Sequence, residues 1–401
     1  MGRFDYILFF SVLILCAIGI MLIYGATYNS KYPWEKNLYK RQITYCIVGL
    51  VLLFIFWRLP MRLHYAVAYL YYIVILLILA GLFLFGGEGV KRWVDLGFFQ
   101  FQPSEFAKLV IIFVISRYLM DTRTETSSFL RIALLGLLIL FPFLFIINQP
   151  DLGTGMVFIV LLYSLLFWSD IKFPLFLILL SPIINVVFTV HWVSWALFFI
   201  AFSLFVLLSR VRFPVAIGAI LGNLALGVAA PFFWRQLKDY QQERILVFLD
   251  PSRDPFGVGY QVLQSKITVG SGKMFGKGFL GGTQTNLAFL PVRHTDFIFA
   301  VLGEEFGFLG ILLVLGLYFI VIYSAFRIAR DAKGHFPRFV AAGLGTLLLF
   351  QVAVNVGMVV GLLPVTGLPL PFLSFGGSSV AIFMISTGLL LNIHSNKGEF
   401  V

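Results

Sequence analysis

Long apolar runs separated by short polar stretches fill most of the chain. A run of about 20 apolar residues is the length that an α-helix needs to cross a bilayer. About twelve such runs occur, and they begin near Ile7, Ile43, Val67, Phe106, Ile132, Met156, Phe173, Val193, Pro214, Phe297, Val340 and Val380. The pattern predicts an all-α polytopic membrane protein with about twelve transmembrane helices, and it divides least clearly between Gly153 and Trp234.

An even number of spans places both ends of the chain on the same side of the membrane. Basic residues gather in alternate short loops, as the positive-inside rule expects of the cytoplasmic side. With a cytoplasmic N-terminus, the inner loops and span ends hold Arg58, Arg62, Arg117, Arg123, Lys172, Arg210, Arg212, Arg327, Arg330, Lys333 and Arg338. Four basic residues of the first outer loop weaken this orientation without reversing it, namely Lys31, Lys36, Lys40 and Arg41. The long hydrophilic segment from Arg235 to Asp296, here called the outer segment, then faces outward.

The composition excludes an ordinary soluble domain. Hydrophobic residues make up 60% of the 401 residues, charged residues make up only 12%, and the mean hydropathy is +0.98. The net charge of +11 is dispersed over loops and membrane ends, so it indicates contact with anionic lipids and not with nucleic acid. Cys16 and Cys46 lie in or beside spans and are expected to be buried thiols. The first apolar run is followed by no cleavage motif, so we expect it to remain as a membrane anchor.

Charged residues inside spans are informative because a charge at the centre of a membrane helix costs roughly 2.5–3.5 kcal/mol on insertion scales. Pro103 and Ser104 indicate a helix start, after which Glu105 and Lys108 are three residues apart and share a face. They predict either an internal ion pair, which is favoured, or a pair that lines a cavity. Trp93 precedes this helix at the expected membrane interface, where tryptophan is common.

Two further segments break the apolar pattern. In INQPDLGTG, Asp151 is expected to cap the helix that follows it. In LLPVTGLPLPFLSFGGSS, prolines and glycines interrupt the chain between two spans. Irregular backbone at membrane depth is tolerated only where protein buries it or where it lines a cavity. This segment is therefore either a re-entrant pore loop or a wall of a groove for a lipid substrate.

The outer segment mixes acidic and basic residues on a glycine-rich backbone. Lys and Arg neutralise phosphates, and glycine lets backbone N–H groups approach them, so the segment suits a phosphate-bearing ligand. A carboxylate among these charges can accept a proton. Val262, Ile267 and Phe275 indicate amphipathic pieces on the membrane surface. A functional loop is favoured over a solvated linker, and its candidate residues are Asp250, Asp254, Asp296, Arg244, Arg253, Lys266, Lys273, Lys277, Arg293 and His294.

A series of short motifs runs along the chain from Lys91 to Ser379. They read WVDLG, QPSEFAKL, QPDLGT, DPFGVGYQ, QSKI, GKGF, GTQ, FLP, HTDFIFAV, GEEFG and LPLPFLSFGGSS. In this order they resemble the SEDS family of cell-wall polymerases, and QSKI and GTQ are more similar to its rod-elongation branch, RodA, than to its division branch, FtsW. The family has ten spans, whereas the stretch between Gly153 and Arg235 carries two more by our count. The resemblance implies a single SEDS-type transmembrane domain over residues 1–401 with an extracytoplasmic catalytic loop over residues 235–296.

This resemblance implies a peptidoglycan glycosyltransferase of the bacterial cytoplasmic membrane, active during cell elongation and shape maintenance. Its substrate would be lipid II, an undecaprenyl diphosphate that carries a disaccharide-pentapeptide, polymerised on the outer face. The family's essential aspartate corresponds to Asp254, in the second Asp-Pro of the outer segment, and Asp250 occupies the first. We expect Asp254 to be the one base of an inverting transfer that releases undecaprenyl diphosphate. The implied substrate-binding residues are Trp93, Arg244, Asp250, Lys266, Lys273, Lys277, Gln284, His294 and Asp296, and Glu105 with Lys108 corresponds to a structural polar pair.

The same resemblance implies a cation and protein partners. A divalent ion, Mg or Mn, would help to offset the diphosphate charge, and no organic cofactor is expected. A single-span class B penicillin-binding protein, which is the transpeptidase that crosslinks the strands, is expected near the spans that begin at Phe297 and Val340. Other membrane proteins of the elongation complex are expected as further partners.

Two other functional classes stay open. A flippase or other transporter of lipid-linked precursors would also suit a many-span bundle with buried charges, but it would gather polar residues at the midplane on broken helices. A non-catalytic scaffold of the elongation machinery predicts that Asp254 can be replaced without loss of polymer. The concentration of polar residues in the outer segment favours the polymerase.

Overall fold

Twelve long apolar helices form most of the described part of this chain. The computed structural model describes residues 4–30, 32–85, 92–95, 100–122, 129–149, 151–169, 171–209, 211–237, 239–250, 253–254, 257–286, 290 and 292–396. The long helices are α1 (Tyr6–Thr27), α2 (Leu38–Arg58), α3 (Met61–Phe85), α4 (Pro103–Asp121), α5 (Phe129–Asn148), α6 (Leu152–Trp168), α7 (Phe173–Phe188), α8 (Trp192–Leu208), α9 (Phe213–Gln236), α13 (Ile298–Asp331), α14 (His335–Val359) and α15 (Gly377–Ser395). Each begins within a few residues of a start that the apolar pattern predicts, so the predicted all-α architecture is confirmed.

Most of these helices have the length that crossing a bilayer requires. Within the described ranges, eight helices are long and apolar enough to span a membrane. Helices α6, α7 and α8 are also apolar but shorter, with 17, 16 and 17 residues. Helix α4 has 19 residues and carries four charged side chains, those of Glu105, Lys108, Arg117 and Asp121. The chain is therefore a multi-pass membrane protein.

The remaining elements are short and lie outside the long helices. A 3-10 helix, η1 (Glu35–Asn37), precedes α2, and two short strands, β1 (Val94–Asp95) and β2 (Gln100–Phe101), pair antiparallel with Val94 opposite Phe101. The outer segment contains α10 (Asp239–Leu249), α11 (Val258–Ser271) and α12 (Thr283–Asn286).

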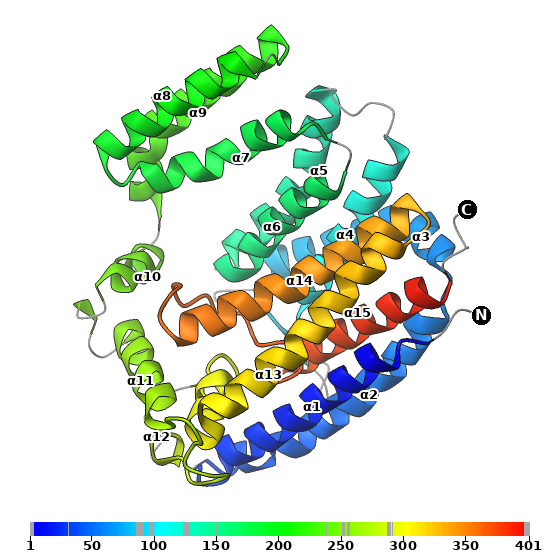
Figure 1. Ribbon diagram of the computed structural model, residues 1–401, viewed down its shortest axis with the longest axis vertical. Coiled ribbons are helices and arrows are strands. Elements are labelled where there is room, and N and C mark those ends of the chain that lie inside the picture. The colour runs from blue at the N-terminus through cyan, green and yellow to red at the C-terminus, as the bar shows by residue number, and fades with distance from the viewer. Residues whose placement is uncertain are drawn as a thin grey trace.

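Both ends of the chain lie at one end of the helix bundle, and α10, α11 and α12 lie at the other (Figure 1). The side-chain contacts agree with this arrangement. Arg327, near the end of α13, forms an ion pair with Asp5 at the start of α1. Trp57 Nε1, at the end of α2, donates to Ser395 Oγ at the end of α15 at 3.3 Å. These contacts join ends that an even number of crossings places together, as the sequence predicts.

Helices α14 and α15 lie deepest in the bundle among the eight long spans that the described residues form. Helix α15 packs against α2, and α14 packs against α4, α6 and α13. Glycines let the backbones approach closely: a Cβ at Gly388 would lie 2.3 Å from the Leu53 carbonyl oxygen of α2, and one at Gly343 would lie 2.8 Å from Ile112 of α4. Small residues at helix contacts are the usual means of close packing in membranes.

The later part of the proline-rich segment between α14 and α15, from Leu370 to Ser374, is buried in protein, whereas Leu362 at its start is 73% exposed. Asn355 Nδ2, on α14, donates to the carbonyl oxygens of Leu368 and Asp296, both at 2.9 Å. Gln42 Nε2, on α2, donates to Ser374 O at 3.2 Å, and Ser374 Oγ donates to Thr295 O at 2.6 Å. Side chains and neighbouring backbone thus satisfy the irregular backbone that a bilayer would leave unpaired. The segment lies against the residues that lead into α13.

Helices α7, α8 and α9 form a small group of their own, and they occupy the stretch that the apolar pattern divides least clearly. They surround a second hydrophobic core, separate from the main one and made of Ile178, Phe202, Val206 and Ala216. Asn223 joins two of the helices, because its carbonyl oxygen accepts from Asn185 Nδ2 at 2.6 Å and its Nδ2 donates to Ser181 Oγ at 2.8 Å. Figure 1 shows the group at one edge of the molecule, far from α1 and α2.

The two thiols, Cys16 and Cys46, are buried and form no disulfide, as predicted.

The contact between α2 and α15 can be tested with one added methyl group. Gly388→Ala places a Cβ 2.3 Å from the Leu53 carbonyl oxygen, so the two helices must move apart. We expect the free energy of unfolding to fall by about 1–3 kcal/mol, as overpacked sites do. Gly81→Ala is the control, since an added Cβ there meets nothing within 4 Å. Thermal unfolding in one detergent compares the two variants, and equal melting temperatures would contradict the packing.

Candidate functional site

The outer segment is a folded layer at the end of the bundle opposite the chain termini (Figure 1). Helix α11 packs against α13 and α14, and Ser265 Oγ donates to Val359 O at the end of α14 at 2.8 Å. Val262 is buried on α11, whereas Ile267 and Phe275 are exposed, Phe275 by 79%. These contacts hold α11 on the membrane helices, which a solvated linker would not require.

Asp254 lies just before α11 and is held by the start of that helix. Its Oδ1 accepts from the backbone N–H of Gly257 at 2.8 Å. A Cβ at Gly257 would lie 2.2 Å from Asp254 Oδ2, so the carboxylate occupies space that only glycine leaves open. Asp250 lies directly after α10, half exposed, with Oδ2 at 3.5 Å from Arg253 Nε. A surface ion pair of this kind contributes little to the free energy of folding. Asp254 thus binds a backbone N–H group at the start of α11, whereas Asp250 lies in a weak surface ion pair.

Asp296 lies within the electric field of charged residues from three other parts of the chain. Burial raises the pKa of Asp296 to about 6, Arg244 and Arg92 oppose that rise, and Asp151 adds to it. Arg244 lies on α10, Arg92 precedes β1, and Asp151 precedes α6. The fold therefore gathers two of the predicted binding residues, Arg244 and Asp296, around one polar region.

Asp151 and Arg92 are fixed by their own hydrogen bonds. Asp151 Oδ1 accepts from the backbone N–H of Thr154 at 3.1 Å, which makes it the predicted cap of α6. Arg92 Nε donates to Gln149 O at 2.7 Å in the turn between α5 and α6. The capping prediction is correct. In addition, the charge of Asp151 raises the pKa of Asp296.

His294 is enclosed by aromatic rings and by the first loop of the chain. Its ring meets Phe375 edge-on at 6.0 Å and Trp34 at 6.5 Å between centroids. Burial lowers the pKa of His294, Glu35 raises it, and the adjacent Arg293 lowers it further. Arg293 Nε donates to Ala26 O at 2.6 Å, which ties this point to the end of α1. His294 therefore lies where the outer segment packs against the first loop and the segment before α15.

Three predicted binding residues lie apart from these groups. Trp93 is 45% exposed beside β1. Lys266, exposed on α11, passes over Gly361, where an added Cβ would lie 1.9 Å from Lys266 Cε. Lys273 is exposed in the loop after α11. Across the described ranges, none of the three forms a hydrogen bond between its side chain and another predicted binding residue.

Glu105 and Lys108 form an ion pair inside the bundle. Lys108 Nζ lies 2.5 Å from Glu105 Oε1, and the two side chains are 0% and 4% exposed. Helix α4, which carries the pair, packs against α3, α6 and α14. Two opposite charges that share one face can enter the bundle together because each offsets the desolvation of the other.

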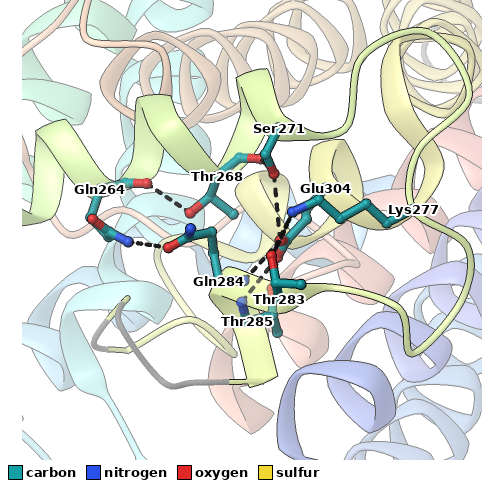
Figure 2. Close-up of polar contacts among 8 residues, drawn as sticks. All are labelled: Gln264, Thr268, Ser271, Lys277, Thr283, Gln284, Thr285 and Glu304. Carbon is teal, nitrogen blue, oxygen red and sulfur yellow. Dashed lines mark hydrogen bonds and ion pairs between the residues drawn. The ribbon is translucent and has the colours of Figure 1, made fainter.

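Glu304 on α13 accepts several hydrogen bonds from the outer segment. Its carboxylate accepts from Lys277 Nζ at 2.7 Å, Gln284 N at 2.8 Å, and Thr285 through N at 2.9 Å and Oγ1 at 2.6 Å, as Figure 2 shows. Thr283 Oγ1 lies 3.3 Å from the same carboxylate. We call Lys277, Thr283, Gln284, Thr285 and Glu304 the Glu304 cluster. It contains two predicted binding residues, Lys277 and Gln284, and it places the Lys277 ammonium in an ion pair.

A break in α13 lies next to this cluster. Gly307 has φ of 63° and ψ of −162°, which interrupts the helical hydrogen bonds on both sides. The loop after α11 takes up the freed groups. Its N–H groups at Lys277 and Gly278 donate to the carbonyls of Glu304 and Glu305 at 2.9 and 3.0 Å, and its carbonyls at residues 273 and 274 accept from the N–H groups of residues 308 and 309 at 2.9 and 3.2 Å. Four backbone bonds therefore fasten the loop to the break.

Neither Glu304 nor Arg92 has a role that the sequence alone predicts. Two consecutive acidic residues inside an apolar span, in GEEFG, are a signal that could have identified Glu304, because a carboxylate at such a position needs partners. Arg92 offers a weaker signal, one basic residue in a short polar stretch.

The raised pKa of Asp296 predicts a pH dependence of stability. Because its folded pKa of about 6 exceeds the value of 3.8 for an unperturbed aspartate, the folded state binds the proton more tightly. This contribution is present below about pH 4 and is lost as the pH rises through about 6. Thermal unfolding at several pH values should show the melting temperature of the unmodified chain, relative to Asp296→Asn, falling across this range. A difference that stays constant with pH would contradict the assignment.

Comparison with known proteins agrees with these features over nearly the whole chain. Residues 6–196 and 193–399 match the family model of the FtsW, RodA and SpoVE cell cycle proteins. The peptidoglycan glycosyltransferase MrdB of Escherichia coli (strain K12) is 36% identical over 387 residues, which cover 94% of this chain and 92% of the relative. The peptidoglycan glycosyltransferase RodA of Treponema pallidum is 34% identical over 430 residues, with 98% of each chain covered.

Solved structures of related proteins have the same fold as this chain. A chain from a structure of a peptidoglycan synthase complex, described as coordinating polymerisation and crosslinking, has a TM-score of 0.74 at 30% identity and covers 99% of both chains. The rod shape determining protein RodA of Thermus thermophilus has a TM-score of 0.65 at 26% identity, covering 99% of this chain and 98% of its own. The chain belongs to the FtsW/RodA/SpoVE family, which the sequence motifs indicated.

Proposed function

We propose that this chain, a peptidoglycan glycosyltransferase of the FtsW/RodA/SpoVE family, polymerises lipid II on the outer face of the cytoplasmic membrane with Asp254 as its base. The observation that carries the proposal is the fixed carboxylate of Asp254 at the start of α11. It lies in the folded outer segment, which also contains the basic residues Arg244, Lys266 and Lys273. Two relatives that are named peptidoglycan glycosyltransferases match this chain over 94% and 98% of its length.

The proposed reaction is a single displacement. The 4-hydroxyl of one lipid II sugar attacks the anomeric carbon of the growing chain, and the bond from that carbon to the diphosphate oxygen breaks. The hydroxyl proton passes to the Asp254 carboxylate, undecaprenyl diphosphate leaves with the electron pair, and the anomeric configuration inverts. One carboxylate suffices because no covalent intermediate forms. The Gly257 bond to Oδ1 holds the carboxylate in one orientation, which favours proton transfer.

Basic side chains of the outer segment would offset the charge of the diphosphate. Arg244, Lys266 and Lys273 are the proposed ligands. Lys266 and Lys273 are exposed, and Arg244 lowers the pKa of Asp296, which supports their assignment as ligands. Lys277 differs from them because its ammonium already pairs with Glu304.

A divalent cation stays a proposal. In the described parts of the chain, no three His, Cys, Asp or Glu side chains gather in a way that could hold a metal ion. These residues do not build a metal site of their own, and no step of the reaction above depends on one. Adding Mg or Mn to a polymerisation assay tests whether the ion acts with the substrate.

We propose a class B penicillin-binding protein as the partner, with its single span against α13 and α14. The solved peptidoglycan synthase complex supports this, since its description joins polymerisation with crosslinking. Helix α13 presents an exposed apolar face formed by Phe308, Leu309, Leu312, Leu313 and Phe319, which suits either lipid or a partner helix. Other membrane proteins of the elongation complex are proposed to bind the same assembly.

The polymerase predicts a large and specific effect of Asp254→Asn. The amide cannot accept the proton, so polymer formation should fall by about 10²-fold or more, the usual contribution of a general base. Purified chain, with its transpeptidase partner and a divalent cation, is incubated with labelled lipid II, and the products are separated on a gel. Asp331→Asn is the control, because this exposed carboxylate at the far end of α13 lies in a surface pair with Arg330 and should cost little activity.

Each outcome separates the proposed functions. Ladders from the unmodified chain and from Asp331→Asn, with none from a folded Asp254→Asn, support the polymerase and its base. Equal ladders from all three reject Asp254. An absence of ladders from every variant, despite confirmed partner binding, favours a flippase or a scaffold.

A further inference from the structure

We infer that Glu304 is a positioning residue for this reaction, with Lys277 as its counter-ion and not as a ligand of the diphosphate. The inference rests on the proposed polymerase function. It concerns how the outer segment is held in place, a task that the sequence motifs do not assign to either residue.

The carboxylate of Glu304 is buried and is surrounded by hydrogen-bond donors. Its side chain is 0% exposed, and three N–H or O–H donors besides Lys277 lie within 2.9 Å. Two of these donors are backbone N–H groups, of Gln284 and Thr285, which fix the course of the chain itself. Hydrogen bonds to an ionised acceptor are about twice as strong as neutral ones. Removing the charge would leave buried donors without an acceptor.

The cluster reaches α11 through two side-chain contacts. Gln284, whose N–H binds Glu304, accepts through Oε1 from Gln264 Nε2 on α11, as Figure 2 shows. Ser271, at the end of α11, also directs its hydroxyl to Glu304 at 3.4 Å. Helix α11 begins directly after Gly257, the residue that binds Asp254. A continuous series of contacts therefore joins Glu304 to the proposed base through one rigid helix.

The position of Lys277 fits a counter-ion better than a phosphate ligand. Its Nζ lies 2.7 Å from Glu304 Oε1 and donates to Thr283 Oγ1 at 2.7 Å. The side chain is 26% exposed, and its partner is fully buried. A diphosphate that recruited this ammonium would have to leave the Glu304 charge buried without a cation, which is strongly unfavourable. Lys266, which is exposed on α11, has no such constraint in the described structure.

A double-mutant cycle distinguishes the two roles of Lys277. The variants are Glu304→Gln, Lys277→Met and the double variant, each assayed as the full chain with its partner for kcat and KM toward lipid II. If Glu304 positions the loop, each single variant lowers kcat by about tenfold to 10²-fold with little change in KM, as a misplaced group does. The double variant should then be no worse than the poorer single one, because both remove one interaction. Lys277→Arg, which keeps the charge, should restore most of the activity.

Lys266→Met is the comparison. As a proposed phosphate ligand it should raise KM, and its effect should multiply with that of Glu304→Gln because the two residues share no partner. Asp331→Asn, an exposed carboxylate at the far end of α13, should behave as the unmodified chain. Hydrogen exchange of residues 272–286 should quicken in Glu304→Gln while exchange in α14 and α15 stays unchanged, which excludes global unfolding.

Two results would overturn the inference while leaving the polymerase intact. The first is a Lys277→Met variant that raises KM and combines multiplicatively with Glu304→Gln. The second is a Glu304→Gln variant with unchanged kcat and unchanged exchange. If the unmodified chain forms no polymer, the proposed function itself fails, so the two failures are distinguishable.

Discussion

The position of the outer segment depends on the break in α13 at Gly307. A helix that crosses a membrane satisfies its own backbone groups, and a break frees several of them at once. Here the freed carbonyls of Glu304 and Glu305 and the freed N–H groups of residues 308 and 309 all find partners in the loop that follows α11. The loop lies so close that a Cβ at Gly307 would be 2.3 Å from the backbone nitrogen of Gly276. The break and the loop are thus complementary, and neither would be stable with the other absent.

This arrangement gives the outer segment, which we propose to be catalytic, a rigid support. Helix α11 is bonded to α14 through Ser265 and to the Glu304 cluster through Gln264, and the same cluster lies beside the break. Proximity and orientation make a large contribution to catalysis, so an outer segment that moved freely would be a poor catalyst. Asp254 is fixed at the start of α11 by one backbone bond and by the space that Gly257 leaves.

Much of the architecture followed from the sequence, because each of these features is local. The apolar runs gave the starts of the twelve helices, the INQPDLGTG turn gave Asp151 as a cap, and the i,i+3 spacing indicated the pair of Glu105 and Lys108. The site was harder, because its contacts join residues that are distant in the chain. The sequence suggested Lys277 as a phosphate ligand, and it could not show the ion pair with Glu304 because that residue is 27 positions away. Likewise, GEEFG lies in the apolar run that begins near Phe297, and nothing in the apolar pattern indicates a positive φ at Gly307.

The measurement that tests this account most directly compares Gly307→Ala with Gly316→Ala, a site on the same helix where an added Cβ meets nothing within 4 Å. Both variants are assayed for polymerisation of lipid II and for hydrogen exchange at residues 272–278. The account predicts that Gly307→Ala loses most of its activity and exchanges faster in the loop, with the membrane helices still folded, and that Gly316→Ala matches the unmodified chain. Full activity in Gly307→Ala would contradict the claim that the break in α13 positions the outer segment.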